Sequence, residues 1–467
     1  MNLIVLLFLT SFSYLFAGDY GDVYGAHPAA NAMGNAVVST VNDSSSVFYN
    51  VAGLGKQNSG DIILGQIEQK KEGESPESKL VEEGGSLWSK IKTGSFTYVP
   101  SYRTEKTPHE LTLQFHLGRP SLNTSAPSNQ DLNRVRDDYL GLGLTINLNS
   151  IYDLKRNFRF GLNILLPGTG QLLTVNDINP TVHRYLQHGV SNQKPTIMGG
   201  VGIELWKDRL FAGVGFTALA GGKGAILLKD VPISPDRVIP NQQVILEVKP
   251  FVNPTFGLAF QYGKFNLGVS YRREVALAIN ELPARAQTTL LGIQLDFDVS
   301  LFDLFTPRKW AYGIGYRPLE KWTFTFDVNR ELWSAFRQSR TKATYSERIY
   351  FNDITIYRGG VEYAWKDWLK FRGGIARRPR PTPIMASSQN WMDFDRMIYT
   401  LGFSFILIPG TYSFLENLKS PVILDFVAEY QKLHGEHVYK YVATERNPNY
   451  SMGGRVLHFG FSLTTYF

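Results

Sequence analysis

The residues of this chain that could act chemically are charged side chains, spaced along segments in which polar and apolar residues alternate. Successive side chains of a strand point to opposite faces, so these charges share the face opposite the apolar residues. The cations there are Arg159, Arg272, Arg317, Arg358, Lys370 and Arg372, and the acids are Glu274, Asp327, Glu362, Asp425 and Glu429. Buried charges need partners, so ion pairing across this face is one reading. The other is an unpaired arginine that attracts an anionic ligand.

Motifs for catalysis or metal binding are weak. The chain contains no Cys, which excludes a thiol nucleophile, a disulfide scaffold and a Cys-based zinc site. No Gly-x-Ser-x-Gly elbow and no phosphate-binding loop occurs. His434 and His437 lie close together, but no third ligand is near them in the sequence. We therefore expect no catalytic residue, no metal and no cofactor.

The segments that carry the charges are typical of barrel strands. Beyond residue 60 the hydrophobic period is almost always two, as in 140–148, 158–164, 265–271 and 397–405. The opposite face holds Gly, Thr, Ser, Asn and charged residues, and no second class of strands could supply a partner sheet. The pattern favours an all-β, antiparallel transmembrane barrel with a polar interior over a soluble sandwich.

The last strand points to the outer membrane. One face carries Leu457, Phe459, Phe461, Leu463, Thr465 and Phe467, and the other carries His458, Gly460, Ser462, Thr464 and Tyr466. An outer-membrane barrel closes its last strand against its first with one face in lipid. We expect the phenylalanines to face lipid and the His458 face to point inward.

The N-terminus and the charge agree with export. The apolar block Leu3–Phe16, followed by Ala17 and Gly18, predicts a signal peptide over residues 1–17. The net charge of +7 comes from scattered cations. Such cations suit loops near anionic lipid and a charged lumen, and nucleic acid is not an expected partner.

Connections alternate between short and long, as between periplasmic turns and extracellular loops. The short ones are 206–209, 263–264, 318–321 and 366–367, and the long ones are 167–195, 220–254, 335–349, 378–396 and 434–453. Counting back from Phe467 gives about 14 strands, the first near 110–117. Two more runs, 62–67 and 95–102, would make the count about 16, and the stretch around 68–95 is a charged insertion.

Residues 18–56 do not alternate and are rich in Ala, Gly, Asn and Ser. Helical potential lies around Pro28–Thr40, and Asp43 could cap a turn over Ser44–Phe48. Such a small, compact segment would fit inside the barrel as a plug, or it could form a periplasmic extension. The predicted domains are a signal peptide at 1–17, a plug at 18–56 and a barrel at 57–467.

Four motifs follow one another in the chain: GAHPAANAMGNAVVSTVNDSSSVFYNVAGL (25–54), LGVSYRREV (267–275), FTFDVNRELWSAF (324–336) and YRGGVEYAWKDWLKFRGGIARRPRPTP (357–383). Together they resemble the FadL family, outer-membrane channels for long-chain fatty acids and other hydrophobic compounds. The first is similar to the family's hatch, with Asn50, Ala52 and Gly53 in place and Val51 where the family has Pro.

The resemblance implies a 14-stranded barrel filled by an N-terminal hatch, and passive uptake. Ligand would be caught at the extracellular end, pass to an apolar pocket beside the hatch, and leave sideways through the wall. The resemblance also implies a hatch or gate role for Asn50, Val51, Ala52 and Gly53. An apolar pocket suits an acyl chain because each buried CH₂ contributes about 0.8 kcal/mol. Basic ligand contacts are implied at Arg340 and Lys223.

Three classes of function fit an outer-membrane barrel. The first is an uptake channel for hydrophobic small molecules, the second a general porin or surface adhesin, and the third an outer-membrane hydrolase. The expected partners are a hydrophobic ligand, outer-membrane lipid and the barrel-assembly machinery that receives the C-terminal strand, with the protein as a monomer. The sequence leaves open which hydrophobic ligand is carried.

Overall fold

The computed structural model describes residues 20–57, 109–126, 136–152, 154, 156–168, 183–188, 195–228, 242–277, 284–290, 293–299, 304–335, 350–388, 390–407, 420–445 and 447–467. The predicted signal peptide and the runs 62–67 and 95–102 lie outside these ranges. No helix in the described part of the chain is both long and apolar enough to cross a membrane.

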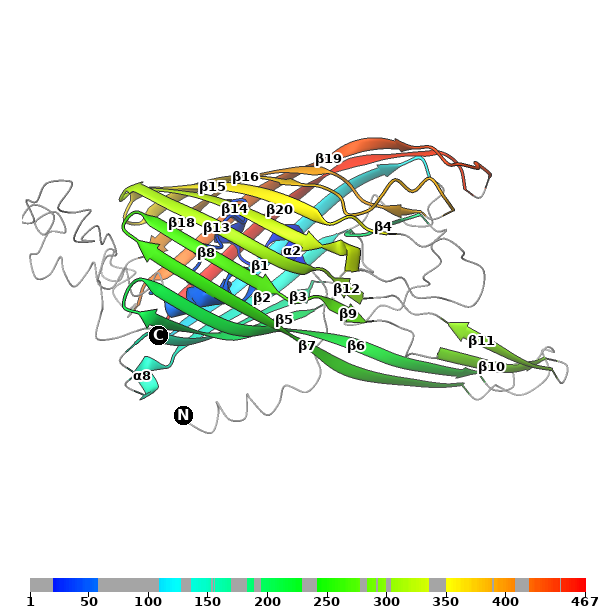
Figure 1. Cartoon of the computed structure of the whole chain (residues 1–467), viewed down its shortest axis with the longest axis horizontal. Coiled ribbons are helices and arrows are strands. Elements are labelled where there is room, and N and C mark those ends of the chain that lie inside the picture. Colours follow the sequence, from blue (N-terminus) through cyan, green and yellow to red (C-terminus); the bar gives the residue numbers. More distant parts are fainter. Residues whose placement is uncertain are drawn as a thin grey trace, which may run out of the picture.

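Fourteen antiparallel strands close into one barrel (Figure 1). In order around the wall they are β1 (Glu110–Thr124), β2 (Asp137–Asn147), β3 (Phe158–Pro167), β5 (Thr196–Trp206), β6 (Leu210–Leu228), β7 (Gln242–Tyr262), β8 (Phe265–Arg272), β13 (Arg308–Leu319), β14 (Trp322–Leu332), β15 (Ile354–Lys366), β16 (Leu369–Arg378), β18 (Arg396–Leu407), β19 (Val422–Val438) and β20 (Tyr450–Tyr466). The barrel closes where β1 pairs with β20, from Glu110 opposite Tyr466 to Thr124 opposite Met452. The count of 14 and the start at residue 110 are confirmed.

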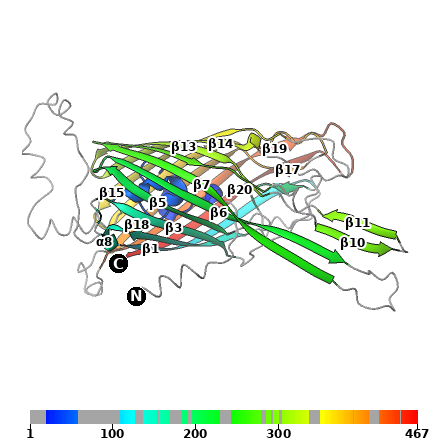
Figure 2. The same cartoon turned by 60° about the horizontal axis from the view of Figure 1, so that its bottom comes forward.

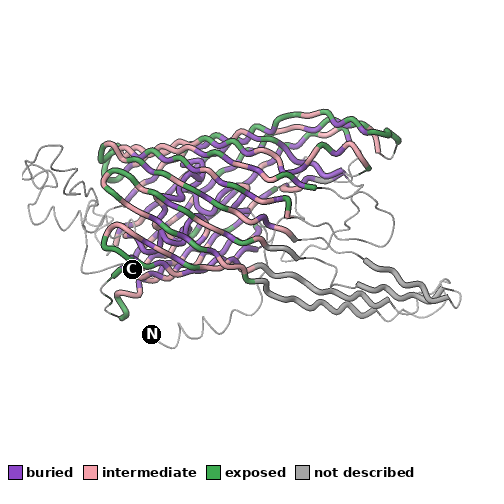
Figure 3. The backbone as a smooth tube through the Cα atoms, in the orientation of Figure 1, coloured by how far each residue is buried: buried purple, intermediate pink, exposed green. Residues whose placement is uncertain are grey.

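Alternation sorts the side chains of each strand between lumen and exterior. On β20, His458 and Ser462 are fully buried, whereas Phe459 is 51% exposed and Phe467, just beyond the strand, 64% exposed. Buried residues alternate with half-buried or exposed ones along most of the described wall (Figure 3). The predicted orientation of the last strand is confirmed.

The barrel has a short-turn end and a long-loop end. At the short-turn end, few residues separate β5 from β6, β7 from β8, β13 from β14 and β15 from β16. The predicted loop over 220–254 is wrong, because β6 and β7 stay paired as far as Leu228 opposite Gln242. Gly and Pro residues there signal a loop in the sequence, but backbone pairing continues through them. The resulting hairpin projects past the long-loop end (Figure 2).

The predicted loop over 434–453 is also too long. Strand β19 continues to Val438 and β20 begins at Tyr450, with a register shift between Leu433 and Glu436. Shorter elements complete the fold: α8 (Asn149–Tyr152) at the short-turn end, and the pairs β9 (Val275–Leu277) with β12 (Leu304–Thr306), β10 (Ala284–Leu290) with β11 (Ile293–Val299), and β4 (Arg184–Tyr185) with β17 (Trp391–Met392).

Residues 20–57, called here the inner segment, lie inside the barrel. They form α2 (Tyr20–Tyr24), α3 (Pro28–Ala32), α4 (Ser46–Tyr49) and the 3-10 helix η1 (Val51–Gly55). Helix η1 contacts β3, β5, β6 and β7, while α3 contacts β16, β18, β19 and β20 on another arc of the wall. The blue helices of Figure 1 are accordingly enclosed by the strands.

Local sequence explains two of these helices. Helix α3 begins at Pro28, a residue suited to the first helical turn, and the His27 side chain accepts a hydrogen bond from the Ala29 amide at 3.1 Å. Asp43 caps the turn that leads into α4, because its carboxylate accepts from the Ser45 amide at 2.8 Å and its carbonyl oxygen from the Ser46 amide at 3.0 Å, although α4 itself runs over Ser46–Tyr49 and not from Ser44.

Candidate functional site

Glycines in the wall make room for η1. A Cβ atom on Gly213 would lie 2.5 Å from the carbonyl carbon of Val51, and one on Gly257 would lie 2.2 Å from Asn50 Oδ1. A Cβ on Gly202 would lie 2.6 Å from the Gly55 amide nitrogen. These glycines belong to β5, β6 and β7, so the η1 turn and Asn50 before it pack closely against three neighbouring strands. The sequence showed glycine on the inner face, but not that it serves this contact.

The predicted hatch or gate residues form this turn. Asn50 accepts from the Ala52 amide at 3.2 Å and donates to the carbonyl oxygens of Val38 at 2.8 Å and Leu258 at 3.0 Å. It therefore joins the inner segment to β7. Val51 and Ala52 are buried, and a Cβ on Gly53 would lie 2.4 Å from the Val41 carbonyl oxygen. A gating role for the four residues stays a prediction.

Gly213→Ala should therefore loosen the inner segment. The added methyl would overlap the backbone of Val51, which has no rotamer to change. Overpacking of this kind costs about 1–3 kcal/mol in the free energy of unfolding. Urea unfolding of the folded barrel in lipid vesicles measures it. Gly435→Ala is the matched control, since its Cβ would meet only the Met452 carbonyl oxygen at 3.5 Å; equal losses in the two variants would contradict the packing.

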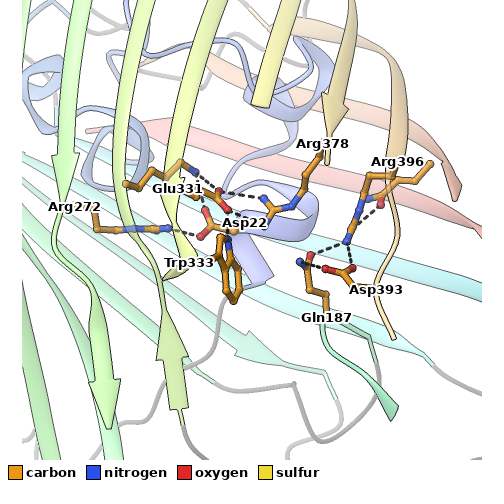
Figure 4. Close-up of polar contacts among 10 residues, drawn as sticks. Asp22, Gln187, Arg272, Glu331, Trp333, Arg378, Asp393 and Arg396 are labelled. Carbon is orange, nitrogen blue, oxygen red and sulfur yellow. Dashed lines mark hydrogen bonds and ion pairs between the residues drawn. The ribbon is translucent and has the colours of Figure 1, made fainter. Parts of the chain in front are cut away.

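A buried ion network fastens α2 to the wall near the long-loop end (Figure 4). Asp22 pairs with Arg272 and, at 3.0 Å, with Lys309. Glu331 accepts two hydrogen bonds from Arg378, at 3.1 and 3.0 Å. Lys309 also lies 3.6 Å from Glu331, which links the two halves.

Most of this network was not predicted from the sequence. Glu331 and Arg378 lie on the same faces as the predicted Asp327 and Arg372, so extending the alternation toward the strand ends would have found both. No comparable signal exists for Asp22, which lies in the inner segment. A second cluster in Figure 4 joins Arg396 to Asp393 at 3.1 Å and to Gln187 at 2.8 Å.

Arg159, Arg358 and Arg372 also face inward as predicted, whereas Glu274 lies beyond the end of β8 and pairs with the partly exposed Arg308 at 2.7 Å. Arg159 donates to the Lys56 carbonyl oxygen at 2.6 Å, and Arg358 donates to that of Gly34 at 3.1 Å. Both arginines therefore hold backbone of the inner segment. Arg372 bridges Glu362 at 2.7 Å and Asp425 at 3.1 Å across the wall.

Arg317 differs from these arginines. It is half-buried and donates to Thr323 Oγ1 at 3.3 Å. Within the described ranges, no carboxylate oxygen lies within 4 Å of its guanidinium group. The predicted ligand contacts are not placed: Arg340 lies outside the described residues, and only the backbone of Lys223 is described, opposite Glu247 in the β6–β7 hairpin.

The lumen beside the network is apolar toward the long-loop end. The upper apolar cluster consists of Trp333, Phe351, Ile354, Ile356, Met385 and Trp391, all buried, with Leu186 and Phe305 packed against it. Ring centroids are 6.1 Å apart for Trp333 and Phe351 and 6.3 Å apart for Phe351 and Trp391. Trp333 also donates to Glu331 at 2.9 Å, so the cluster adjoins the ion network.

The lumen below the inner segment is polar. One cavity of about 180 Å³ is lined by charged residues that include Arg372, Glu362 and Asp425. A second, of about 90 Å³, reaches the turns at Asp208 and Lys264. An apolar surface therefore lies on one side of the inner segment and a charged one on the other.

Comparison with known proteins agrees with this architecture. The family model "Outer membrane protein transport protein (OMPP1/FadL/TodX)" matches residues 249–412. Alkane uptake protein A of Marinobacter nauticus is 28% identical over 148 residues, which cover 30% of this chain and 31% of that protein. The match thus spans less than a third of the relative's length.

Solved structures share the fold over nearly the whole chain. A Pseudomonas aeruginosa FadL homologue superposes with a TM-score of 0.53 at 12% identity, covering 95% of this chain and 98% of the other. The monoaromatic hydrocarbon channel CymD gives a TM-score of 0.50 at 12% identity, covering 97% and 99%. The matched segment is similar to that family of outer-membrane transport proteins, and the whole chain shares the β-barrel fold of the FadL homologue.

Proposed function

We propose that the protein is a passive channel for the uptake of long-chain fatty acids or other hydrophobic small molecules across the outer membrane. The observation that carries the proposal is the upper apolar cluster, which lies inside a barrel whose lumen is occupied by the inner segment. Apolar surface inside a lumen suits an apolar ligand. The alkane-uptake relative and the hydrocarbon channel of the same fold support this ligand class.

The route we propose starts at the long-loop end, which we assign to the outside of the cell. Ligand passes over the upper apolar cluster and is released past the inner segment, sideways through the wall. The charged cavities below the inner segment support a lateral exit, since an acyl chain would lose its apolar contacts there. In this proposal residues 18–56 form the plug and 57–467 the barrel, behind a signal peptide at 1–17.

Met385→Gln tests the cluster as the ligand surface. The substitution keeps side-chain length but adds an amide, and burying an amide without a partner costs about 1–3 kcal/mol. We expect affinity for a brominated long-chain fatty acid, measured by quenching of tryptophan fluorescence, to fall roughly tenfold. Met385→Leu is the matched control and should bind nearly as well as the wild type. Equal binding by all three proteins would remove the cluster from the route.

Arg340 and Lys223 remain proposed contacts for the carboxylate of an anionic ligand. Loss of a charge-assisted hydrogen bond costs about 1.5–3 kcal/mol. Arg340→Ala should therefore weaken the binding of a fatty acid about tenfold or more. The affinity for an uncharged alkane should stay the same. Unchanged fatty-acid affinity would exclude Arg340 from the site.

A hydrolase is the second candidate, and one observation favours it. Near the long-loop end, His437 Nδ1 lies 2.7 Å from the Ser451 hydroxyl oxygen, and both residues are exposed. A serine hydrolase also needs an oriented base and an oxyanion hole. Covalent labelling of Ser451 by a fluorophosphonate probe would support this alternative, and failure to label the folded protein would argue against it.

Two further partners belong to the proposal. Outer-membrane lipid would contact the outward aromatic rings, and the barrel-assembly machinery would receive the C-terminal strand. The protein would act as a monomer, without cofactor and without catalytic activity.

A further inference from the structure

Two cations meet at the short-turn end without a carboxylate partner. Lys56, at the end of the inner segment, is 3% exposed, and its Nζ donates to the Ser39 carbonyl oxygen at 2.6 Å. Arg317, on β13, donates to Thr323. Among the described residues, neither side chain has a carboxylate oxygen within 4 Å. Glu362 interacts with Arg317 electrostatically from beyond 4 Å, so neither cation is in direct contact with a negative group, although buried charge is normally paired.

A cavity of about 90 Å³ lies between the two cations. Its lining adds Lys264 and five amide side chains, those of Asn42, Gln57, Asn157, Gln261 and Asn266. Amide and cationic N–H groups are the donors that bind oxyanions. Phe211 is the one large apolar side chain in the lining, so the cavity suits a small polar anion and not an acyl chain.

Two acids, Glu204 and Asp208, also line the cavity. Glu204, which is 1% exposed, accepts from the backbone amides of Asp208 at 2.6 Å and Asn157 at 3.4 Å. Burial and the neighbouring Arg317 also lower the pKa of the Lys56 ammonium to about 7. An anion beside the two cations would offset that cost.

We propose that this cavity is an oxyanion-binding site in which Lys56 and Arg317 hold a phosphate, a sulfate or the carboxylate headgroup of a ligand. The site joins the end of the inner segment to β13, so a bound anion would tie the two together. It opens beside the turns at Asp208 and Lys264 and does not depend on uptake of hydrophobic compounds.

Titration of the folded full-length protein in detergent tests the site. Inorganic phosphate, sulfate, acetate and decanoate are each added at constant ionic strength near pH 6, and binding is followed by calorimetry and by the thermal unfolding temperature. Binding of phosphate or sulfate identifies an inorganic anion. Stronger binding of decanoate than of acetate, lost in the variants below, identifies a ligand headgroup.

Lys56→Met and Arg317→Gln should each weaken oxyanion binding about tenfold or more, because each removes a charge-assisted hydrogen bond. Lys207→Met, at an exposed position of the β5–β6 turn, is the matched control and should bind as the wild type does. If Lys56→Met does not fold, the comparison of Arg317→Gln with the wild type decides whether the site exists, because Arg317 is only half-buried. No binding of any oxyanion by the wild type, or equal binding by wild type and Arg317→Gln, would overturn the proposal.

Discussion

Removal of residues 20–57 should turn the barrel into an open, ion-conducting pore. The inner segment contacts at least eight strands of the wall, and nearly all of its residues are buried. Barrels of 16–18 strands hold an aqueous channel, so a 14-stranded barrel without its filling should also conduct. We expect the single-channel conductance of the deletion variant in planar bilayers to be about tenfold or more above that of the wild type.

The conductance experiment needs proof that the deletion variant folds. Heat-modifiable migration in gels reports an intact barrel, and only material that passes this test is measured. Gly435→Ala, at an uncrowded position, serves as a folded control with an intact inner segment. A folded deletion variant that conducts no better than the wild type would show that the inner segment is not what closes the lumen. A wild type that already conducts like a porin would favour the porin alternative.

Glu331→Leu should cost about 3–5 kcal/mol in the free energy of unfolding, the usual loss when one partner of a buried ion pair is removed. The Glu331 side chain is fully buried and accepts hydrogen bonds from Arg378 and Trp333. Leucine removes all of these acceptors and leaves the Arg378 guanidinium in a buried site. Urea unfolding in lipid vesicles gives the free energy.

Two comparisons make the Glu331 result specific. Glu320→Leu, at an exposed position of the β13–β14 turn, should change the free energy of unfolding by roughly 0.5 kcal/mol or less. The double variant Glu331→Leu, Arg378→Leu should recover part of the loss, because it removes both charges. A loss below about 1 kcal/mol in Glu331→Leu would mean that the pair contributes little to holding the network.

The barrel could be predicted because its signal is repeated along the sequence. Period-two alternation and the aromatic C-terminal strand identified the strands, their inner faces and the start at Glu110. That same parity placed Arg159, Arg358 and Arg372 in the lumen. Local rules suffice for these features, because the direction of a side chain depends on its position within its own strand.

Partners across the lumen could not be predicted in this way. Asp22 and Arg272 are 250 positions apart and meet only because the inner segment folds back through the barrel. The packing of η1 against the wall likewise depends on Gly213 and Gly257. In the alternating pattern these two glycines appear only as small residues. The extension of the β6–β7 hairpin beyond residue 220 was missed because its Gly and Pro residues outweigh the strand pattern locally. Such features depend on tertiary contacts that no short window of sequence contains.

Uptake by whole cells tests the proposed function most directly. Cells that lack other channels for hydrophobic compounds are supplied with a radiolabelled long-chain fatty acid, a labelled long-chain alkane or a labelled hydrophilic sugar. Production of the protein should raise the initial rate for at least one hydrophobic compound several-fold and leave the rate for the sugar unchanged. Met385→Gln should lower that gain, and Met385→Leu should keep it. A raised rate for the sugar, or no gain for either hydrophobic compound from a correctly folded protein, would contradict the account.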